Sequence, residues 1–315
     1  MPAVAASAGE PLPWASRPPS VRHSRHRGER RASLAVPLIR LLERALPLPV
    51  LLGLCGPVAW LRAAVFRLAK GRPRPLPRPD WLGCPRAFRP ARLPVYLDRV
   101  LEALPDRLAL PAWRRRCRFD GLEHLHAATR SGRGAVLAFL HFGPVELLGP
   151  WLRAAGEPAS LLVRFEPHGR PRQKCTKDAL ARFPGVPPVF QRDELAAAVR
   201  HLAAGRPLGV ALDATAGRQL RLQHPSGWDG PLATGAIRLA CRHGVPLLAC
   251  AITRTGAWRY AVEVSPPVPP EAWAGGEEAI ARCLLDFLLP LLRRHPEQCH
   301  PSLLGVKPPA PRAAA

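Results

Sequence analysis

A histidine and a glutamate interrupt an otherwise apolar stretch, AVLAFLHFGPVELLG, at residues 135–149. His141 supplies an imidazole that can act as a general base near neutral pH. The carboxylate of Glu146 can accept a hydrogen bond from one ring nitrogen, which fixes the tautomer and leaves the other nitrogen as the base. A core histidine satisfied by packing, beside an incidental glutamate at a helix start, is the alternative interpretation.

The spacing between the two residues restricts the backbone that can bring them together. On one ideal helix, His141 and Glu146 would lie about 140° apart around the axis and would not meet. They can meet if the imidazole follows a strand at 135–140, Gly143 and Pro144 make the turn, and the carboxylate lies in the first helical turn. The pair then lies at the carboxyl end of a strand, where open α/β sheets place their sites.

The sequence offers no covalent nucleophile for this pair. It contains no GxSxG motif, and no cysteine is evident as a partner of His141. The chemistry indicated is therefore direct deprotonation of a substrate hydroxyl, without a covalent enzyme intermediate.

The elements around the pair alternate regularly in type. Their pattern predicts an α/β fold, with a central, mostly parallel mixed sheet flanked by helices. The last predicted helix ends at Gly244, a residue suited to a helix C-terminus. The predicted strands are 135–140, 160–164, 208–213, 246–252 and 258–264, and the predicted helices lie near 121–130, 145–155, 192–204 and 233–243.

The N-terminal part of the chain has a different composition. Its longest uncharged piece, ALPLPVLLGLCGPVAWL at 45–61, is shorter than the roughly 20 residues of a spanning helix and is flanked by arginines. We expect a membrane-associated helical hairpin, and a hairpin buried against the main domain is the alternative. The predicted organisation is a disordered basic tail (1–32), this hairpin (33–70), a Pro/Arg-rich linker and helix (71–115), the main domain (116–305) and a disordered tail (306–315).

Charge and cysteine content narrow the classes of partner. The chain has 46 Lys and Arg against 23 Asp and Glu, a net charge of +23, which favours an anionic partner or surface. The eight cysteines have no paired CxxC spacing, which indicates reduced thiols and disfavours a zinc site or a disulfide framework. The nearness of His295, Cys299 and His300 is only a weak hint of a metal, so no metal is predicted.

Several motifs resemble a known family in the same order along the chain. HFGPVE resembles the His-x4-Asp/Glu motif of the lysophospholipid acyltransferase superfamily and, more narrowly, the bacterial lipid A lauroyl/myristoyl acyltransferase family. The chain departs from the family pattern at Pro144, Val145, Ala214 and Cys299. The other matching pieces are GLEHLHAATRSGRGAVL (121–137), LLVRF ending near Arg164, LAAGRPLGVALDA ending at Asp213-Ala214, GPLATGAIRLACRHGVPLLACAI (230–252) and RRHPEQC (293–299).

The resemblance, which covers roughly 116–300, implies an acyltransferase without a cofactor. An acyl-carrier protein or acyl-CoA thioester would be the donor, and a hydroxyl of a lipid A-type glycolipid precursor would be the acceptor. His141 and Glu146 would be catalytic. Arginines in and before FEPHGRPRQK (165–174) would bind an acceptor phosphate, unless this stretch is simply a solvated loop. Asp213 would orient a substrate hydroxyl or cap a helix, and the expected substrate-binding residues are Arg164, Arg170, Arg172, Asp213 and Thr234.

Localisation and the remaining alternatives follow from the same observations. We expect a peripheral or single-anchored protein at the cytoplasmic face of the cell inner membrane, bound to its anionic surface and to no specific nucleic acid. A lysophospholipid or another glycolipid is the alternative acceptor. The alternative from another class is a basic nucleic-acid-binding protein, which the net charge would suit.

Overall fold

The computed structural model describes most of the C-terminal two thirds of the chain. The predicted tails at 1–32 and 306–315 lie outside the described residues, as do most of the predicted hairpin (33–70) and linker (71–115). The described residues are 79–83, 98, 114–130, 132–163, 189–214, 217–300 and 303, together with scattered helical residues between 50 and 68.

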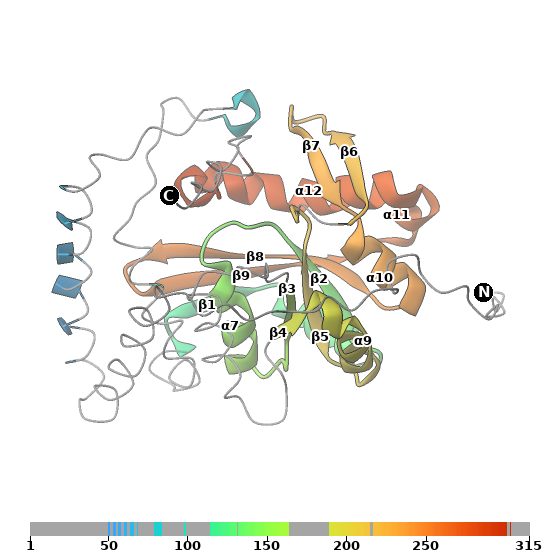
Figure 1. The fold of residues 1–315 in the computed structure, drawn as a ribbon, viewed down its shortest axis with the longest axis horizontal. Coiled ribbons are helices and arrows are strands. Elements are labelled where there is room, and N and C mark those ends of the chain that lie inside the picture. The colour runs from blue at the N-terminus through green and yellow to red at the C-terminus, as the bar shows by residue number, and fades with distance from the viewer. Residues whose placement is uncertain are drawn as a thin grey trace, which may run out of the picture.

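A central sheet organises this part of the chain. In the described residues its seven strands have the order β1-β9-β8-β2-β5-β3-β4 (Figure 1). Every neighbouring pair is parallel except β8 and β9, which are antiparallel. The predicted fold, a mostly parallel mixed sheet, is therefore confirmed. The strands are β1 (Cys117–Asp120), β2 (Ala135–Phe139), β3 (Ser160–Val163), β4 (Val189–Gln191), β5 (Pro207–Ala211), β8 (Leu247–Gly256) and β9 (Arg259–Pro267).

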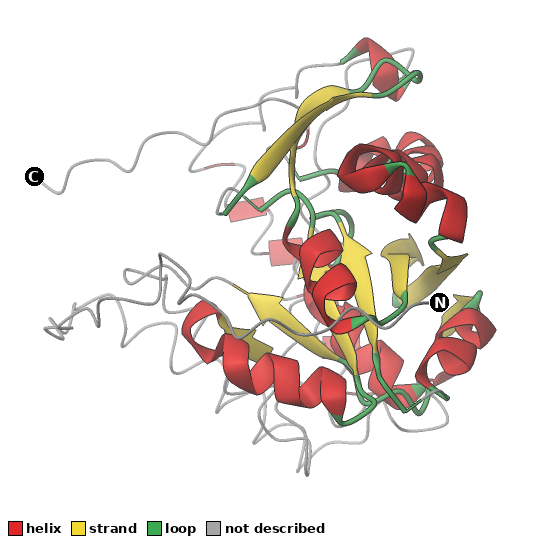
Figure 2. Ribbon diagram, turned by 90° about the vertical axis from the view of Figure 1, so that its right-hand side faces the viewer, coloured by secondary structure: helices red, strands yellow, loops and turns green. Residues whose placement is uncertain are grey.

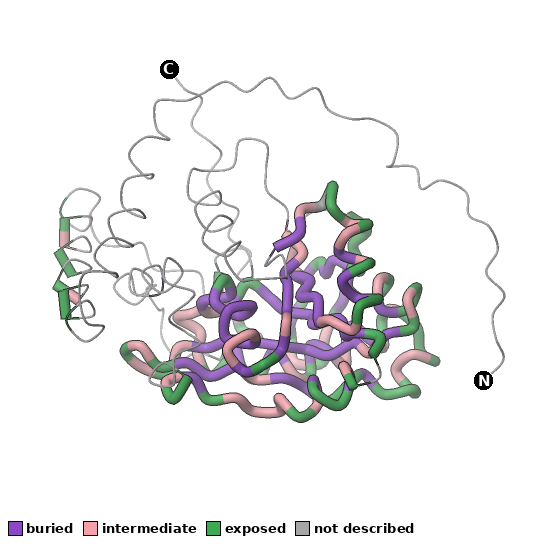
Figure 3. Tube along the Cα trace, turned by 90° about the horizontal axis from the view of Figure 1, so that it is seen from below, coloured by how far each residue is buried: buried purple, intermediate pink, exposed green. Residues whose placement is uncertain are grey.

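Helices cover both faces of the sheet (Figures 1 and 2). Residues on β2 alternate between the faces: Val136 and Ala138 pack in one apolar cluster, and Ala135, Leu137 and Phe139 pack in the other. Helices α9 (Leu195–Ala203), α10 (Gly235–His243) and α12 (Gly276–Arg294) contribute to the first cluster, and α6 (Leu122–Thr129) and α7 (Leu148–Ala154) to the second. Strands β2 and β5 are buried along their whole length, in the buried centre of the domain (Figure 3).

A two-stranded hairpin stands apart from the central sheet. Strands β6 (Gln219–Gln223) and β7 (Asp229–Ala233) pair antiparallel and cross over α12 (Figure 1). The short helix α11 (Pro270–Ala274) precedes α12, and a 3-10 turn at Pro296–Gln298 follows it. Further single turns lie at Asp80–Leu82, Val145–Leu147 and Arg192–Glu194.

Large apolar side chains are exposed in the described residues between 50 and 68, where the membrane-associated hairpin was expected. No described helix combines the length and the apolar character needed to cross a bilayer.

Candidate active site

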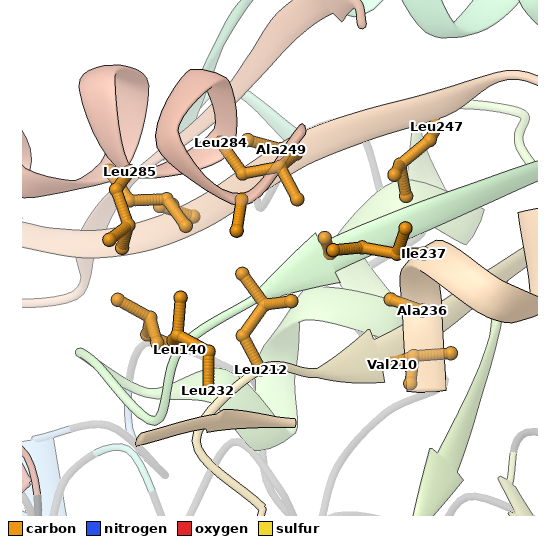
Figure 4. Close-up of a cluster of buried hydrophobic side chains, with 14 of the residues drawn as sticks. Leu140, Val210, Leu212, Leu232, Ala236, Ile237, Leu247, Ala249, Leu284 and Leu285 are labelled. Atoms are coloured by element: carbon orange, nitrogen blue, oxygen red, sulfur yellow. The ribbon is translucent and has the colours of Figure 1, made fainter. Parts of the chain in front are cut away.

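Strand register brings His141 beside Asp213. Strands β2 and β5 are parallel neighbours in which Phe139 lies opposite Ala211, so the imidazole and the carboxylate each follow two residues later at the same edge. The pairing continues past the strands, because the backbone N–H of Leu212 donates to the carbonyl of Phe139 at 2.7 Å. Leu140 and Leu212, which directly precede His141 and Asp213, are buried in the same apolar cluster (Figure 4).

The carboxylate of Asp213 holds the ring of His141. Nδ1 of the ring lies 2.8 Å from Oδ1, and the backbone N–H of His141 lies 3.2 Å from each carboxylate oxygen. The side chain of Asp213 is 8% exposed and that of His141 is 46% exposed. A carboxylate at Nδ1 keeps the proton on that nitrogen, so Nε2 is left to act as a base toward an incoming molecule.

The residue bonded to the His141 ring is Asp213, not Glu146 as the sequence predicted. Glu146 was expected to hold the imidazole, but it lies exposed on the 3-10 turn Val145–Leu147, and Asp213 occupies Nδ1. Glu146 acts through its charge. Partial burial lowers the pKa of His141, but the hydrogen bond and charge of Asp213, together with the charge of Glu146, outweigh burial and raise this pKa above its ordinary 6.5.

The turn between His141 and Glu146 requires glycine at position 143. Gly143 has a φ of 65°, in the left-handed region that side chains disfavour, and a Cβ there would overlap the carbonyl oxygen of Ile252 on β8. Its N–H donates to the carbonyl of Gln298 at 3.0 Å. The predicted Gly-Pro turn is thus present, and it lies tightly against both β8 and the segment after α12.

The segment after α12 pairs with the residues of this turn. Phe142 and Cys299 form an antiparallel bridge, and the N–H of His300 donates to the carbonyl of His141 at 3.1 Å. The rings of His141 and His300 have centroids 6.2 Å apart. The resemblance of RRHPEQC to the family had marked this segment, but nothing in the sequence indicated that it contacts residues 141–143 or that His300 lies beside His141.

A buried ion pair lies on β8 near the same segment. The guanidinium of Arg254, 13% exposed, pairs with the carboxylate of Asp98, 5% exposed, and the hydroxyl of Tyr260 donates to that carboxylate at 2.8 Å. The backbone of Arg254 is in turn bonded to the side chain of Gln298. No local sequence pattern indicates these four residues, because their pairing depends on contacts between distant segments.

The predicted substrate-binding residues are Thr234, Asp213 and three arginines, of which the structure describes the first two. Thr234 is 1% exposed and its hydroxyl lies 3.4 Å from the carbonyl of Arg218, so its assignment to substrate binding stays a prediction. Asp213 contacts the ring and the backbone N–H of His141, and its role toward a substrate hydroxyl stays a prediction. Arg164, Arg170 and Arg172 lie outside the described residues. Within the described part of the chain, no three His, Cys, Asp or Glu side chains gather as metal ligands.

A family comparison decides what kind of protein carries this geometry. The model of the bacterial lipid A biosynthesis acyltransferase family matches residues 108–300, which is more than half of the chain and includes all of the site. The chain belongs to this family. It is therefore an acyltransferase that acts on lipid substrates, as the resemblance implied, and the nucleic-acid-binding alternative is set aside.

Comparisons with individual proteins add little to the family match. No curated protein matches this acyltransferase at a significant level. Among solved structures it is similar to the 1-acyl-sn-glycerophosphate (LPA) acyltransferase PlsC from Thermotoga maritima. The TM-score is 0.37 and the identity 15%, over 65% of this chain and 81% of that one. This likeness is too weak to support a conclusion about the substrate.

Proposed function

We propose that the enzyme transfers a fatty acyl chain from an acyl-carrier protein or acyl-CoA thioester to a hydroxyl of a lipid A-type glycolipid precursor. His141 is the general base. The observation that carries this proposal is the hydrogen bond of 2.8 Å between His141 Nδ1 and Asp213, which orients a half-exposed imidazole at the carboxyl edge of the sheet. The family match supports the acyl transfer and the lipid substrate.

In the proposed reaction, Nε2 of His141 takes the proton of the acceptor hydroxyl while the oxygen attacks the thioester carbonyl carbon. Asp213 keeps the other ring proton in place, and Asp213 and Glu146 stabilise the imidazolium that forms. When the tetrahedral intermediate collapses, the carbon–sulfur bond breaks and the imidazolium returns its proton to the departing thiolate. General-base catalysis of this kind contributes roughly 10²–10⁴-fold to the rate.

The acceptor carries phosphate in this proposal, and arginines bind it. Arg164, Arg170 and Arg172 are the proposed donors, because guanidinium groups bind phosphate oxygens in a bidentate manner. Their replacement by lysine would keep the charge and lose that geometry, so the acceptor KM should rise while the fold is unchanged.

We propose that residues 33–70 seat the enzyme on the anionic cytoplasmic face of the inner membrane. The described residues of this segment expose large apolar side chains, which is what contact with a bilayer requires. These residues, between 47% and 87% exposed, are Val50, Leu54, Trp60, Leu61, Val65 and Leu68. A chain that lacks residues 1–70 should leave the membrane fraction at high salt. If it stays in the pellet, the attachment lies elsewhere.

The decisive test combines lipid mass spectrometry with a purified assay. Cells with the wild-type chain should contain a lipid species one acyl chain heavier than cells with His141→Ala, and the mass of that species identifies the acceptor. The purified protein is then offered this acceptor with acyl-carrier protein or CoA thioesters. His243→Ala, which removes a half-buried histidine at the end of α10, is the matched control. Wild-type turnover in His141→Ala would refute the general-base assignment, and a lysophospholipid product would change the acceptor class.

A further inference from the structure

We propose that His300 is a second catalytic residue of this site, a neutral imidazole that donates a hydrogen bond to the thioester carbonyl oxygen as negative charge develops there. The inference rests on the proposed acyl transfer, and it assigns the stabilisation of the oxyanion to a side chain that the sequence had not indicated as catalytic.

The backbone places the second imidazole beside the first. The N–H of His300 donates to the carbonyl of His141 at 3.1 Å, directly after the bridge between Phe142 and Cys299. This pairing fixes the position of His300 relative to the catalytic loop. Both histidines are partly exposed to solvent, which leaves them open to an incoming molecule.

The separation of the two rings suits a single reaction centre. Their centroids lie 6.2 Å apart, with an angle of 55° between the ring planes. In the tetrahedral intermediate, the attacking oxygen and the oxyanion are bonded to the same carbon atom. With hydrogen bonds of about 2.8 Å to each oxygen, two rings at this distance can contact both oxygens at once.

The charges around the pair give the two rings different roles. Burial, and then the neighbouring charge of His141, lower the pKa of His300, and the charge of Asp213 offsets this only in part. The pKa of His141 is raised instead, because its ring is bonded to Asp213. The proton taken from the acceptor therefore stays on His141, and His300 stays neutral because a second positive charge beside the first is unfavourable.

A neutral imidazole is suited to the proposed role. It always carries one N–H, which can donate a hydrogen bond without giving up the proton. As the acceptor oxygen attacks, the carbonyl π electrons move onto the carbonyl oxygen, and the N–H of His300 donates to that oxyanion. No proton moves to or from His300. The departing thiolate receives its proton from His141, so the step is balanced.

The test compares His300→Gln, which keeps an N–H donor, with His300→Met, which is of similar length and has none. The full chain is assayed with the acceptor and thioester found for the wild type. We expect His300→Met to lower kcat by about 100-fold with a KM for the acceptor near that of the wild type. His300→Gln should retain most of the activity. His295→Met is the control, because His295 lies in the same segment but pairs with Glu297, at 3.7 Å.

The outcomes separate this proposal from the proposed function. If His300→Met retains activity within about threefold of wild type, the role of His300 is overturned and the proposed acyl transfer is unaffected. The same conclusion follows if the Gln and Met variants lose equal activity with unchanged melting temperatures. An inactive wild type defeats both proposals. A measurement on the wild-type chain does not depend on the folding of any Met variant: its His300 ring, assigned by NMR with His300→Gln, should be neutral at about pH 7. A protonated ring there overturns the proposal.

Discussion

The side chain of Gln298 makes hydrogen bonds to both the backbone N–H and the backbone carbonyl of Arg254. Its Oε1 accepts the N–H of Arg254 and its Nε2 donates to the carbonyl of the same residue, each at 2.8 Å, while its own carbonyl accepts the N–H of Gly143. One residue thus joins the last turn of the domain, the buried ion pair on β8 and the catalytic loop.

Removing these side-chain bonds should affect both stability and activity. Gln298→Leu keeps the volume of the side chain but leaves two part-buried backbone groups without their partner, which should cost about 1–3 kcal/mol of unfolding free energy. The backbone carbonyl at position 298 can still accept the N–H of Gly143, but the side-chain bonds that hold this position against Arg254 are lost, so kcat should fall more than the acceptor KM changes. Urea unfolding and steady-state assays measure the two effects. Gln223→Leu on the exposed edge of β6 is the control, and equal effects in both variants would contradict a positioning role for Gln298.

Asp213→Asn should lower the rate strongly with little change in fold. An amide has the shape of the carboxylate, but it loses the negative charge that stabilises the imidazolium and can select the wrong ring tautomer. We expect kcat to fall by roughly 10²-fold or more with a nearly unchanged melting temperature. Glu146→Gln should lower it far less, because Glu146 acts on His141 through charge alone. A larger loss of kcat in Glu146→Gln than in Asp213→Asn would indicate that Glu146 is the main partner of His141.

The pH profile of activity should report the raised pKa of His141. The base must be unprotonated, so kcat/KM should fall as pH drops through a value above 6.5. Glu146→Gln removes one of the charges that raise this pKa, so the acid limb should move to lower pH in that variant. Rate profiles of the two proteins measure the shift, and an acid limb that moves upward would contradict the assignment.

His201 on α9 should make the fold sensitive to acid. Burial is the main cause that lowers the pKa of this histidine, to about 4. The bond to the carbonyl of Pro207 raises the pKa, whereas the charges of Arg206 and Arg153 lower it. As pH falls, the histidine of the unfolded state is protonated at a higher pH than that of the folded state. The contribution of His201 to the unfolding free energy is therefore fully present above about pH 6.5 and declines as pH falls toward about 4. The loss is about 3 kcal/mol. Urea unfolding between these values should show a shallower decline in His201→Gln, and identical slopes would refute the effect.

Gly143→Ala should be far more damaging than an alanine at another left-handed glycine. A Cβ at Gly143 meets the carbonyl oxygen of Ile252, whereas Gly132, with a φ of 74°, has open space around that position. We expect a loss of about 1 kcal/mol in Gly132→Ala and about 3 kcal/mol in Gly143→Ala, with activity lost only in the second. Thermal unfolding and the acyl transfer assay test this pair, and similar losses would contradict it.

The strands and helices near the site could be predicted from the sequence because their patterns are local. Six consecutive apolar residues, 135–140, end directly before His141, and Gly244 ends α10 with a φ of 59° as expected. The partner of the imidazole could not be predicted in this way. Glu146 is near in sequence, whereas Asp213 becomes a neighbour only through the register of β2 against β5, which no local pattern contains.

Other elements were missed for reasons of length and composition. Strands β1 and β4 have four and three residues, too few to show a clear periodicity. Helix α12 contains Pro290, a residue that normally argues against a helix interior, yet its leucines form much of the core. The contacts of Gln298 and His300 depend on chain segments far apart in the sequence, and so they had no sequence signal.

The pairing of residues 142 and 299 has a consequence for the order in which the site is assembled during synthesis of the chain. About 155 residues separate the two halves of this bridge, and at roughly 5–20 residues per second the ribosome needs about 8–30 s to make them. During that interval His141 has been synthesised, but the segment that pairs with its loop does not yet exist. A nascent chain therefore lacks the support of this pairing until the segment after α12 has been translated and has docked.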